Sequence, residues 1–431
     1  MKRIYIVFIT IIMLTIGYFC YSYIKEKTTD YGHKVVLCIP VYGQSLALGE
    51  EAERITDFDS LRIKYDGRII TENLDYNFGF FDGQEWKQGI KRILQYRKKS
   101  FELSIYGMAE SLTTRFGNDT IFCIFPGGAG MSGIQHLNKS TDHYNKFLGE
   151  IDKAYKKAKE RGWEFLIPAI CWMQGETDII DYTNCDYKKL LKQFCLDINN
   201  DIKRITKQTN NIRMICYQSN VLTIAPYFNR NGYEIKEVKV PQAIIELLQD
   251  DSLFWASGPT YPYTFVNERL HIDAIGQQHI GRLDAIALTN LIKGREKFFG
   301  LIPRSINAIG NDVLIHMNVP CPPLVLDTIS IMPIDNYGFS VITKNGENIL
   351  SQIHIEGDTV KLTSSRSPHN CKIRYAVNGD LMKSGRLHGP RGNLRDSQGD
   401  KISFTLKEYN YPLHNWAYQF DILCKPTIQD E

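Results

Sequence analysis

The sequence predicts an α/β fold in which a parallel sheet is covered by helices on both faces, followed by a smaller β region. Two observations support this prediction. Up to about residue 299, continuous apolar runs of strand length alternate with longer segments of helical periodicity, which is typical of parallel strands buried on both faces. After Phe299 the helical periodicity disappears, and short β-prone runs are interrupted by Gly, Pro, Asn and Asp.

The elements of the first part follow in order along the chain. The expected strands are Lys34–Pro40, Thr120–Phe125, Phe165–Cys171, Ile212–Tyr217 and Leu253–Ala256. The expected helices are Phe101–Arg115, Asp142–Arg161, Asp186–Lys207, Gln242–Leu248 and Ile275–Lys293. Residues 51–100 form a longer connection than such folds usually contain. The aromatic side chains of this connection could stack on a sugar or fill a local core, and both interpretations stay open: Tyr65, Tyr76, Phe78, Phe80, Phe81 and Trp86.

The region after residue 299 reads as a small β-sandwich of the size of one module. Its expected strands are Asp312–Val319, Phe339–Ile342, Ile353–Ile355, Thr359–Thr363, Lys372–Ala376 and Ile402–Leu406. We therefore divide the chain into residues 1–27, 28–299 and 300–431.

Residues 1–27 have the pattern of a membrane anchor. Lys2 and Arg3 precede an uncharged stretch from Ile4 to Ile24, and about 20 apolar residues suffice to cross a bilayer. Because no small-residue cleavage site is evident, we expect an uncleaved signal anchor with the rest of the chain outside the cytoplasm. Cys20 leaves a lipoprotein as the second choice, although the bulky Phe19 precedes it.

Composition argues against several classes of protein. The chain has 431 residues and a net charge of only +3, with no run of Lys and Arg interleaved with aromatics, which argues against a nucleic-acid partner. Its ten cysteines form no Cys-x-x-Cys pair and no zinc-like cluster with histidine, so we expect packed thiols and no metal. A disulfide involving Cys185, Cys195 or Cys371 stays open.

The sequence contains four short polar blocks. Three of them follow expected strands directly, and the fourth lies further along the chain. They are Gly43-Gln44-Ser45, Gly127-Gly128-Ala129-Gly130, Trp172-Met173-Gln174-Gly175-Glu176 and Glu268-Arg269-Leu270-His271. In an open parallel sheet, ligands bind beyond the carboxyl ends of the strands, so the blocks should converge on one crevice. Together they supply the groups that acyl transfer needs.

Each candidate residue is given a role. Ser45 is the candidate nucleophile and His271 the candidate base. Glu268, three residues before His271, is the candidate orienting acid, whereas Asp273 would point away if a helix begins there. The backbone amides of Ser45 and Gly130, with the side chain of Gln174, are candidate oxyanion donors, since an amide donates without changing charge.

Further polar residues are assigned to support of the site. Gln44 belongs to the first block. Glu176 and Asp178 could suggest a metal or a carboxylate pair, but no histidine or third carboxylate accompanies them. We expect Glu176 to hold the third-block loop by hydrogen bonding, and Trp172 to belong to the core.

The blocks resemble those of the SGNH hydrolases, and within them the sialate O-acetylesterase and acetylxylan esterase-like group, over about residues 34–290. This resemblance implies a flavodoxin-like three-layer α/β/α domain and a Ser-His-acid esterase that needs no cofactor. It assigns Ser45 as nucleophile and His271 as base. Two positions depart from the pattern: Glu268 stands where the group usually has Asp, and Leu46 stands where it usually has Asn after the block serine.

The resemblance implies that the substrate is an O-acetylated glycan, either sialic acid or a polysaccharide. Two alternatives stay open: a membrane-tethered O-acetyltransferase that uses the same residues, and an inactive glycan-binding protein. Because every candidate catalytic residue precedes residue 300, we expect the β region to serve stability or polymer binding, and a chain that ends near Phe299 to keep its activity on small esters.

Overall fold

A computed structural model describes residues 34–57, 60, 64–65, 68–71, 101–180, 185–224 and 238–424. The expected anchor, residues 1–27, lies outside this set, as do most of the aromatics of the long connection: Tyr76, Phe78, Phe80, Phe81 and Trp86. Among the helices of these described ranges, none is both long and apolar enough to span a bilayer.

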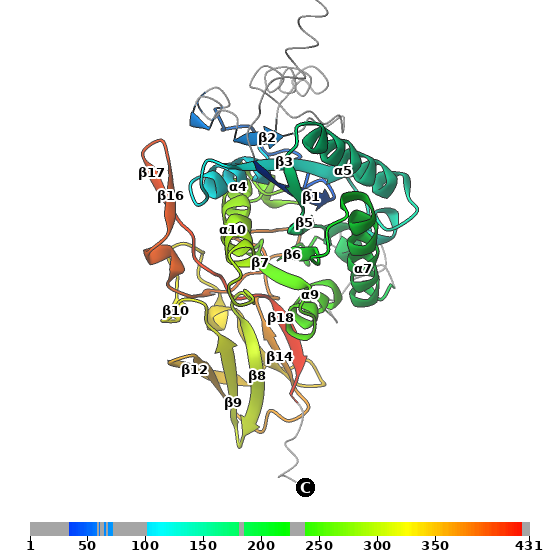
Figure 1. The fold of residues 1–431 in the computed structure, drawn as a ribbon. Coiled ribbons are helices and arrows are strands. Elements are labelled where there is room, and N and C mark those ends of the chain that lie inside the picture. Colours follow the sequence, from blue (N-terminus) through cyan, green and yellow to red (C-terminus); the bar gives the residue numbers. More distant parts are fainter. Residues whose placement is uncertain are drawn as a thin grey trace, which may run out of the picture.

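A parallel sheet forms the centre of the first part of the chain (Figure 1). Its order is β2-β3-β1-β5-β6-β7, and β4 pairs with the start of β1. The strands are β1 (Val35–Gly43), β2 (Ile69–Thr71), β3 (Thr120–Gly128), β4 (Glu164–Leu166), β5 (Ala169–Met173), β6 (Arg213–Gln218) and β7 (Phe254–Pro259). All pairings between them are parallel, which confirms the parallel sheet expected from the continuous apolar runs.

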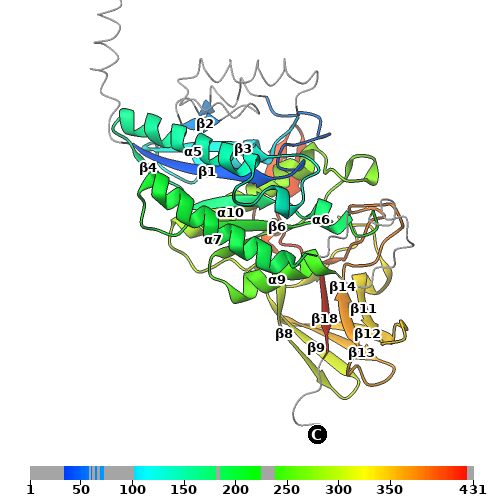
Figure 2. The same ribbon diagram turned by 90° about the vertical axis from the view of Figure 1, so that its right-hand side faces the viewer.

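Helices cover both faces of this sheet, so the three-layer arrangement is also confirmed (Figure 2). Helices α4 (Ser104–Thr113) and α10 (Ala274–Ile292) pack against each other on one face. The other face is covered by α5 (Asp142–Glu160), α7 (Tyr187–Thr206) and α9 (Lys239–Asp250). A short helix, α6 (Glu176–Ile180), follows β5 directly.

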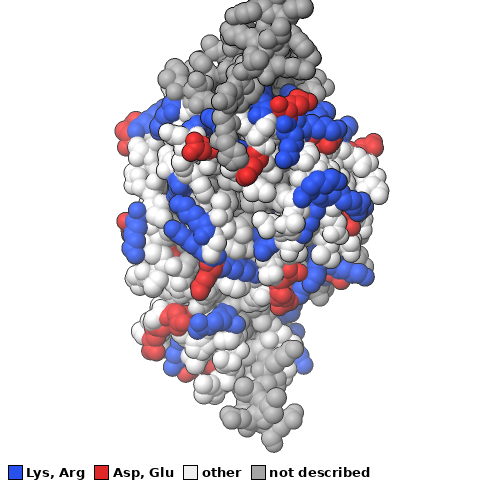
Figure 3. Space-filling model, in the orientation of Figure 1, with Lys and Arg blue, Asp and Glu red and all other residues white. Residues whose placement is uncertain are grey.

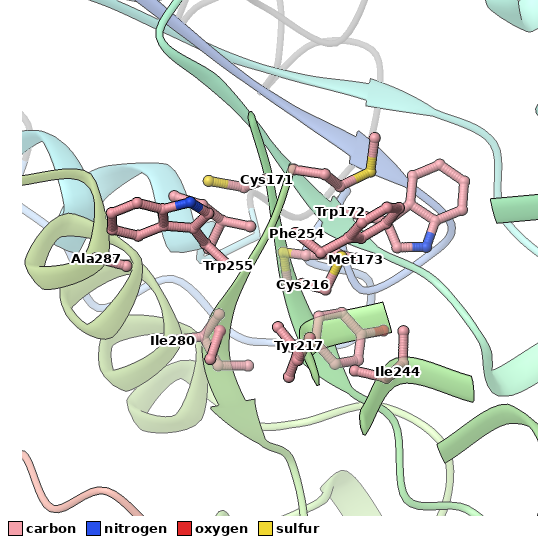
Figure 4. Packing of buried hydrophobic residues seen from close by; sticks show 14 of the residues in the cluster. Cys171, Trp172, Met173, Cys216, Tyr217, Ile244, Phe254, Trp255, Ile280 and Ala287 are labelled. Carbon is pink, nitrogen blue, oxygen red and sulfur yellow. The ribbon is translucent and has the colours of Figure 1, made fainter. Parts of the chain in front are cut away.

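Side chains that alternate along the strands fill the space between sheet and helices. Figure 4 shows Trp255 on the side of α10, near Ala287, while Trp172 lies on the opposite side. The ring of Trp172 is fully buried and packs 4.7 Å from that of Phe194, so it belongs to the core as expected. In the described part of the chain no disulfide joins any cysteines. The strand cysteines are buried in the same core: Cys38, Cys123, Cys171 and Cys216.

Two glycines allow the strand ends to approach each other closely. Gly43 ends β1 and lies opposite Gly128 of β3 and Met173 of β5. A Cβ on Gly43 would lie 1.9 Å from the carbonyl oxygen of Met173, and one on Gly128 would lie 1.8 Å from that of Gly43. Larger residues would push apart the strand ends from which three of the four polar blocks leave the sheet.

The region after residue 300 consists of antiparallel strands, as the loss of helical periodicity predicts. One sheet has the order β12-β13-β9-β8 and another β11-β14-β18. The strands are β8 (Ile302–Ile309), β9 (Asp312–Asn318), β10 (Val325–Leu326), β11 (Phe339–Ile342), β12 (Leu350–Glu356), β13 (Thr359–Ser364), β14 (Lys372–Tyr375), β15 (Leu394–Arg395), β16 (Ser403–Leu406), β17 (Tyr409–Pro412) and β18 (Phe420–Leu423). Strands β10 and β15 form a separate pair, and β16 and β17 form a hairpin.

Part of this β region folds back onto the parallel-sheet region, whereas strands β8, β9 and β12 extend away from it (Figure 1). The side-chain Nε2 of Gln218 donates to the backbone carbonyl of Gln419 at 2.8 Å, and the backbone amide of Gln419 donates to the Oε1 of Gln218 at 2.7 Å. The hydroxyl of Tyr261 donates to the carbonyl of Ala417 at 2.7 Å. The β16–β17 hairpin packs on α10, as Figure 1 shows, where Phe404 lies in a small apolar cluster with Leu283.

Charges of both signs are present on the face of the molecule that Figure 3 shows. In Figure 3 the Lys and Arg side chains alternate with Asp and Glu over the face that is seen. On helix α5, Lys153 and Lys156 form ion pairs with Glu150 and Asp152.

Candidate active site

Ser45 lies directly after β1, at the start of a tight turn. Its carbonyl accepts hydrogen bonds from the amides of Leu48 and Glu50 at 3.1 and 3.0 Å. From α10, the side chain of Gln277 donates to the carbonyl of Leu46 at 2.9 Å. The side chain of Leu46 is itself buried in the core. Backbone hydrogen bonds and Gln277 thus order the serine loop, although Leu46 lacks the amide that the SGNH pattern has at this position.

His271 lies against Ser45, although 226 positions separate them in the sequence. Its Nε2 is 2.8 Å from the Ser45 Oγ. The two side chains are enclosed: Ser45 is 4% exposed and the His271 side chain 14%. The structure therefore brings together the candidate nucleophile and the candidate base at hydrogen-bond distance, which is the geometry that proton transfer from a serine requires.

The carboxylate that contacts His271 belongs to Glu51. Its Oε2 lies 2.8 Å from the His271 Nδ1. With the ring proton on Nδ1, the imidazole donates to Glu51 and accepts from the Ser45 hydroxyl, so one tautomer satisfies both contacts. Glu51 ends the serine loop with a left-handed φ of 64°. Sequence reasoning missed this residue, and the available signal was the acidic pair Glu50-Glu51 shortly after the block serine.

Glu268, which we expected to orient His271, contacts other partners. Its carboxylate is 2.5 Å from the Nζ of Lys383 and 2.5 Å from the Nδ1 of His388. The hydrogen bonds from Lys383 and His388 hold the pKa of Glu268 below its ordinary value. The expectation assumed that a spacing of three residues returns the carboxylate to the ring, but the backbone at Asn267 and Glu268 has φ angles of 53° and 55°.

Asp273 and His279, two further titratable residues of this part of the chain, have structural partners. Asp273 caps α10, where its Oδ1 accepts from the amide of Gly276 at 2.8 Å, and burial raises the pKa of its carboxyl. His279 packs against the rings of Tyr263 and Phe404. Burial lowers the pKa of His279 to about 4.

Gln174 lies buried at the end of β5, with both ends of its amide in use. The hydroxyl of Tyr187 donates to its Oε1 at 2.7 Å. Its Nε2 donates to a carboxylate oxygen of Asp178, and lies 3.2 Å from the carbonyl of Ser132 and 3.3 Å from the Oε1 of Gln44. Tyr187 and Asp178 therefore fix the orientation of the amide, and its role as an oxyanion donor stays a prediction.

The supporting residues form a buried network around this amide. The Oε1 of Gln44 also accepts from the amide of Thr177 at 3.3 Å, which ties the first block to the third. The hydroxyl of Tyr217 lies 2.6 and 2.7 Å from the two carboxylate oxygens of Glu176. Burial raises the pKa of Glu176 to about 7 in spite of this hydrogen bond. In the described ranges, no three His, Cys, Asp or Glu side chains are grouped so that they could hold a metal ion.

The second block lies beside the serine loop. The amide of Ala129 donates to the carbonyl of Gly43 at 3.1 Å. A Cβ on Gly130 would lie 3.0 Å from the Oε1 of Glu50, so Gly130 approaches the turn that follows Ser45. Its role as an oxyanion donor stays a prediction, and this close approach is compatible with it.

The fold of this chain is similar to that of several proteins of known structure. No family model matches the sequence, and no curated protein matches it. A carbohydrate acetylesterase from Xanthomonas citri is similar in structure over 83% of this chain and 79% of its own, with a TM-score of 0.52 and 12% identity. A protein from Arabidopsis thaliana (16% identity, TM-score 0.42) and NanS (14% identity, TM-score 0.41) match 60% and 61% of this chain and 99% of theirs. The fold of this chain is thus shared with a carbohydrate acetylesterase, as the polar blocks predict.

The two acids make a direct prediction. Glu51→Gln keeps the shape of the side chain but removes the charge that would stabilise an imidazolium, so turnover should fall by about 10²-fold or more. Glu268→Gln should cost less, because that carboxylate does not contact the ring. The measurement is kcat on a chromogenic acetyl ester for both variants at one pH. A larger loss in Glu268→Gln would return the orienting role to Glu268.

Removal of the amide tests the oxyanion role. Gln174→Ala should lower kcat by about 10²–10³-fold and leave KM nearly unchanged, because the donor acts on charge that develops only in the transition state. Steady-state kinetics on the same ester check this. If KM rose while kcat stayed constant, Gln174 would be a substrate-binding residue.

Proposed function

We propose that this protein is a serine esterase that removes O-acetyl groups from a carbohydrate. The observation that supports this best is the continuous chain of contacts from the Ser45 Oγ through His271 to Glu51, with both links at 2.8 Å. The shared fold with a carbohydrate acetylesterase supports an acetylated sugar as the class of substrate.

The acylation step follows from these contacts. His271 takes the proton of the Ser45 hydroxyl at Nε2 while the Oγ attacks the acetyl carbonyl carbon. Glu51 stabilises the imidazolium that forms. The Gln174 amide and the backbone amides of Ser45 and Gly130 donate to the oxyanion. As the tetrahedral intermediate collapses, the sugar oxygen leaves with the proton from His271, and the acetyl group stays on Ser45.

Deacylation repeats the same roles with water. His271 removes a proton from a water molecule, which attacks the acetyl-serine carbonyl. Collapse releases acetate and returns the proton to the Ser45 Oγ. Each step is carried by groups of this chain and the two substrates, so the proposal requires no cofactor.

One experiment separates this function from its alternatives. The full-length protein is incubated with a chromogenic acetyl ester and with an acetylated oligosaccharide, with and without an unacetylated glycan acceptor, and free acetate is measured together with acetyl transfer. The proposal expects acetate release from both esters. Acetyl transfer in place of acetate release would indicate an acetyltransferase, and glycan binding without any acetate release would indicate an inactive binding protein.

A further inference from the structure

We propose that Lys383 and His388, which belong to the C-terminal β region, are positioning residues for His271. They act through Glu268, at the tip of the loop that carries the histidine. This inference rests on the proposed function, because it assigns these residues a role in the esterase reaction. In the described hydrogen bonds they contact neither Ser45 nor His271 and act through Glu268.

The loop that carries His271 is a closed hairpin between β7 and α10. Its stem is joined by backbone hydrogen bonds, from Asp273 to Thr264 at 2.9 Å and from Val266 to His271 at 2.7 Å. Beyond the pair of Val266 and His271 the chain turns through a tip that contains Glu268. The position of the imidazole therefore depends on how this tip is held.

A segment of the β region lies along this loop. The amide of Ser384 donates to the carbonyl of Glu268 at 2.9 Å, and that of Arg386 donates to the carbonyl of Tyr263 at 3.1 Å. Between them, Gly385 has a left-handed φ of 84°, and a Cβ there would lie 2.6 Å from the Tyr263 carbonyl oxygen. Only glycine allows the two backbones to approach this closely.

The segment is itself fixed at both ends. The amide of Met382 donates to the carbonyl of Thr223 at 3.0 Å, and the Asn220 side chain donates to the carbonyl of Pro390 at 2.9 Å. Within the segment, the amide of Asp380 donates to the carbonyl of His388 at 2.7 Å. The two side chains that bind Glu268 thus project from a backbone that is anchored independently of them.

The solvent exposure of Glu268, Lys383 and His388 indicates that their ion pairs affect turnover more than stability. The side chains of Glu268, Lys383 and His388 are 22%, 40% and 44% exposed. Ion pairs with this much solvent contact contribute little to the free energy of unfolding, about 0–1 kcal/mol. Catalysis is more sensitive, because a displacement of 1 Å can cost about 10²-fold in rate. Loss of the pairs should therefore lower turnover without lowering stability by much.

The test uses full-length variants assayed on a chromogenic acetyl ester, with melting temperature measured in parallel. Lys383→Met removes one ion pair, His388→Gln removes the second contact, and Lys383→Arg keeps the positive charge opposite Glu268. Lys361→Met is the matched control, because Lys361 forms a 2.8 Å ion pair with Asp312 in the same β region, on strands β13 and β9.

We expect Lys383→Met to lower kcat by about tenfold with little change in KM, by the same positional argument. His388→Gln should lower kcat in the same direction, and Lys361→Met should change neither constant. Lys383→Arg, which keeps the charge, should have a kcat within about threefold of that of the unmodified protein. Unchanged kcat in Lys383→Met, or a loss of the same size in Lys383→Arg, would overturn the inference. Absence of activity in the unmodified protein would instead overturn the proposed function.

Discussion

Ser45→Ala and His271→Ala should each abolish ester hydrolysis. We expect losses of roughly 10⁴- to 10⁶-fold in kcat, because nucleophile and base act as one unit and neither is useful alone. The double variant should be no worse than the single variants for the same reason. The measurement is kcat for the three variants on a chromogenic acetyl ester, beside the unmodified protein.

Folding must be checked in the same variants. Ser45 is small, and the backbone hydrogen bonds of the His271 loop do not depend on the imidazole, so the melting temperature should change little. Circular dichroism should match that of the unmodified protein. The outcome that would contradict the assignment is a folded variant of either residue that retains near-normal turnover.

A chain that ends at Phe299 should lose activity even on small esters. This result reverses the expectation from the sequence, and it follows from the way the β region folds back. Truncation would expose the apolar side chains of Leu283 and Ile286 under the β16–β17 hairpin, and would remove the partners of Gln218 and Tyr261. It would also release the tip of the His271 loop.

Size-exclusion chromatography, thermal unfolding and the small-ester assay check this prediction together. We expect an aggregated chain, or one without cooperative unfolding, because large exposed apolar patches promote association. A monomeric, cooperatively folded truncation with unchanged kcat would show that residues 300–431 form an independent module, as the sequence alone suggested.

The sheet was predictable because its strands carry a local signal. Strands buried on both faces must be apolar throughout, so β1, β3, β5, β6 and β7 stand out from the helices between them. Ser45 and Gln174 could be found for a related reason, since each follows one of these strands at the edge where ligands bind. The structure differs in detail where Pro168 separates β4 from β5, which the sequence suggested as one strand.

The contact between Glu51 and His271 could not be predicted from spacing alone. Glu268 precedes His271 by three residues, which indicates proximity only if the backbone is helical, and the left-handed angles at the tip are not visible in the sequence. Glu51 reaches His271 through the tertiary fold, from a position 220 residues away. The contacts of Lys383 and His388 with Glu268 are also long-range, and no local sequence pattern indicates them.

The most direct measurement of the central claim is covalent labelling of the nucleophile. A fluorophosphonate, which acylation-competent serines attack, is incubated with the full-length protein, and the modified residue is identified by peptide mass spectrometry. We expect one phosphonylated residue, Ser45, with labelling lost in Ser45→Ala and strongly slowed in His271→Ala and Glu51→Gln. Labelling at another residue, or acetate release by a protein that is not labelled at Ser45, would contradict it.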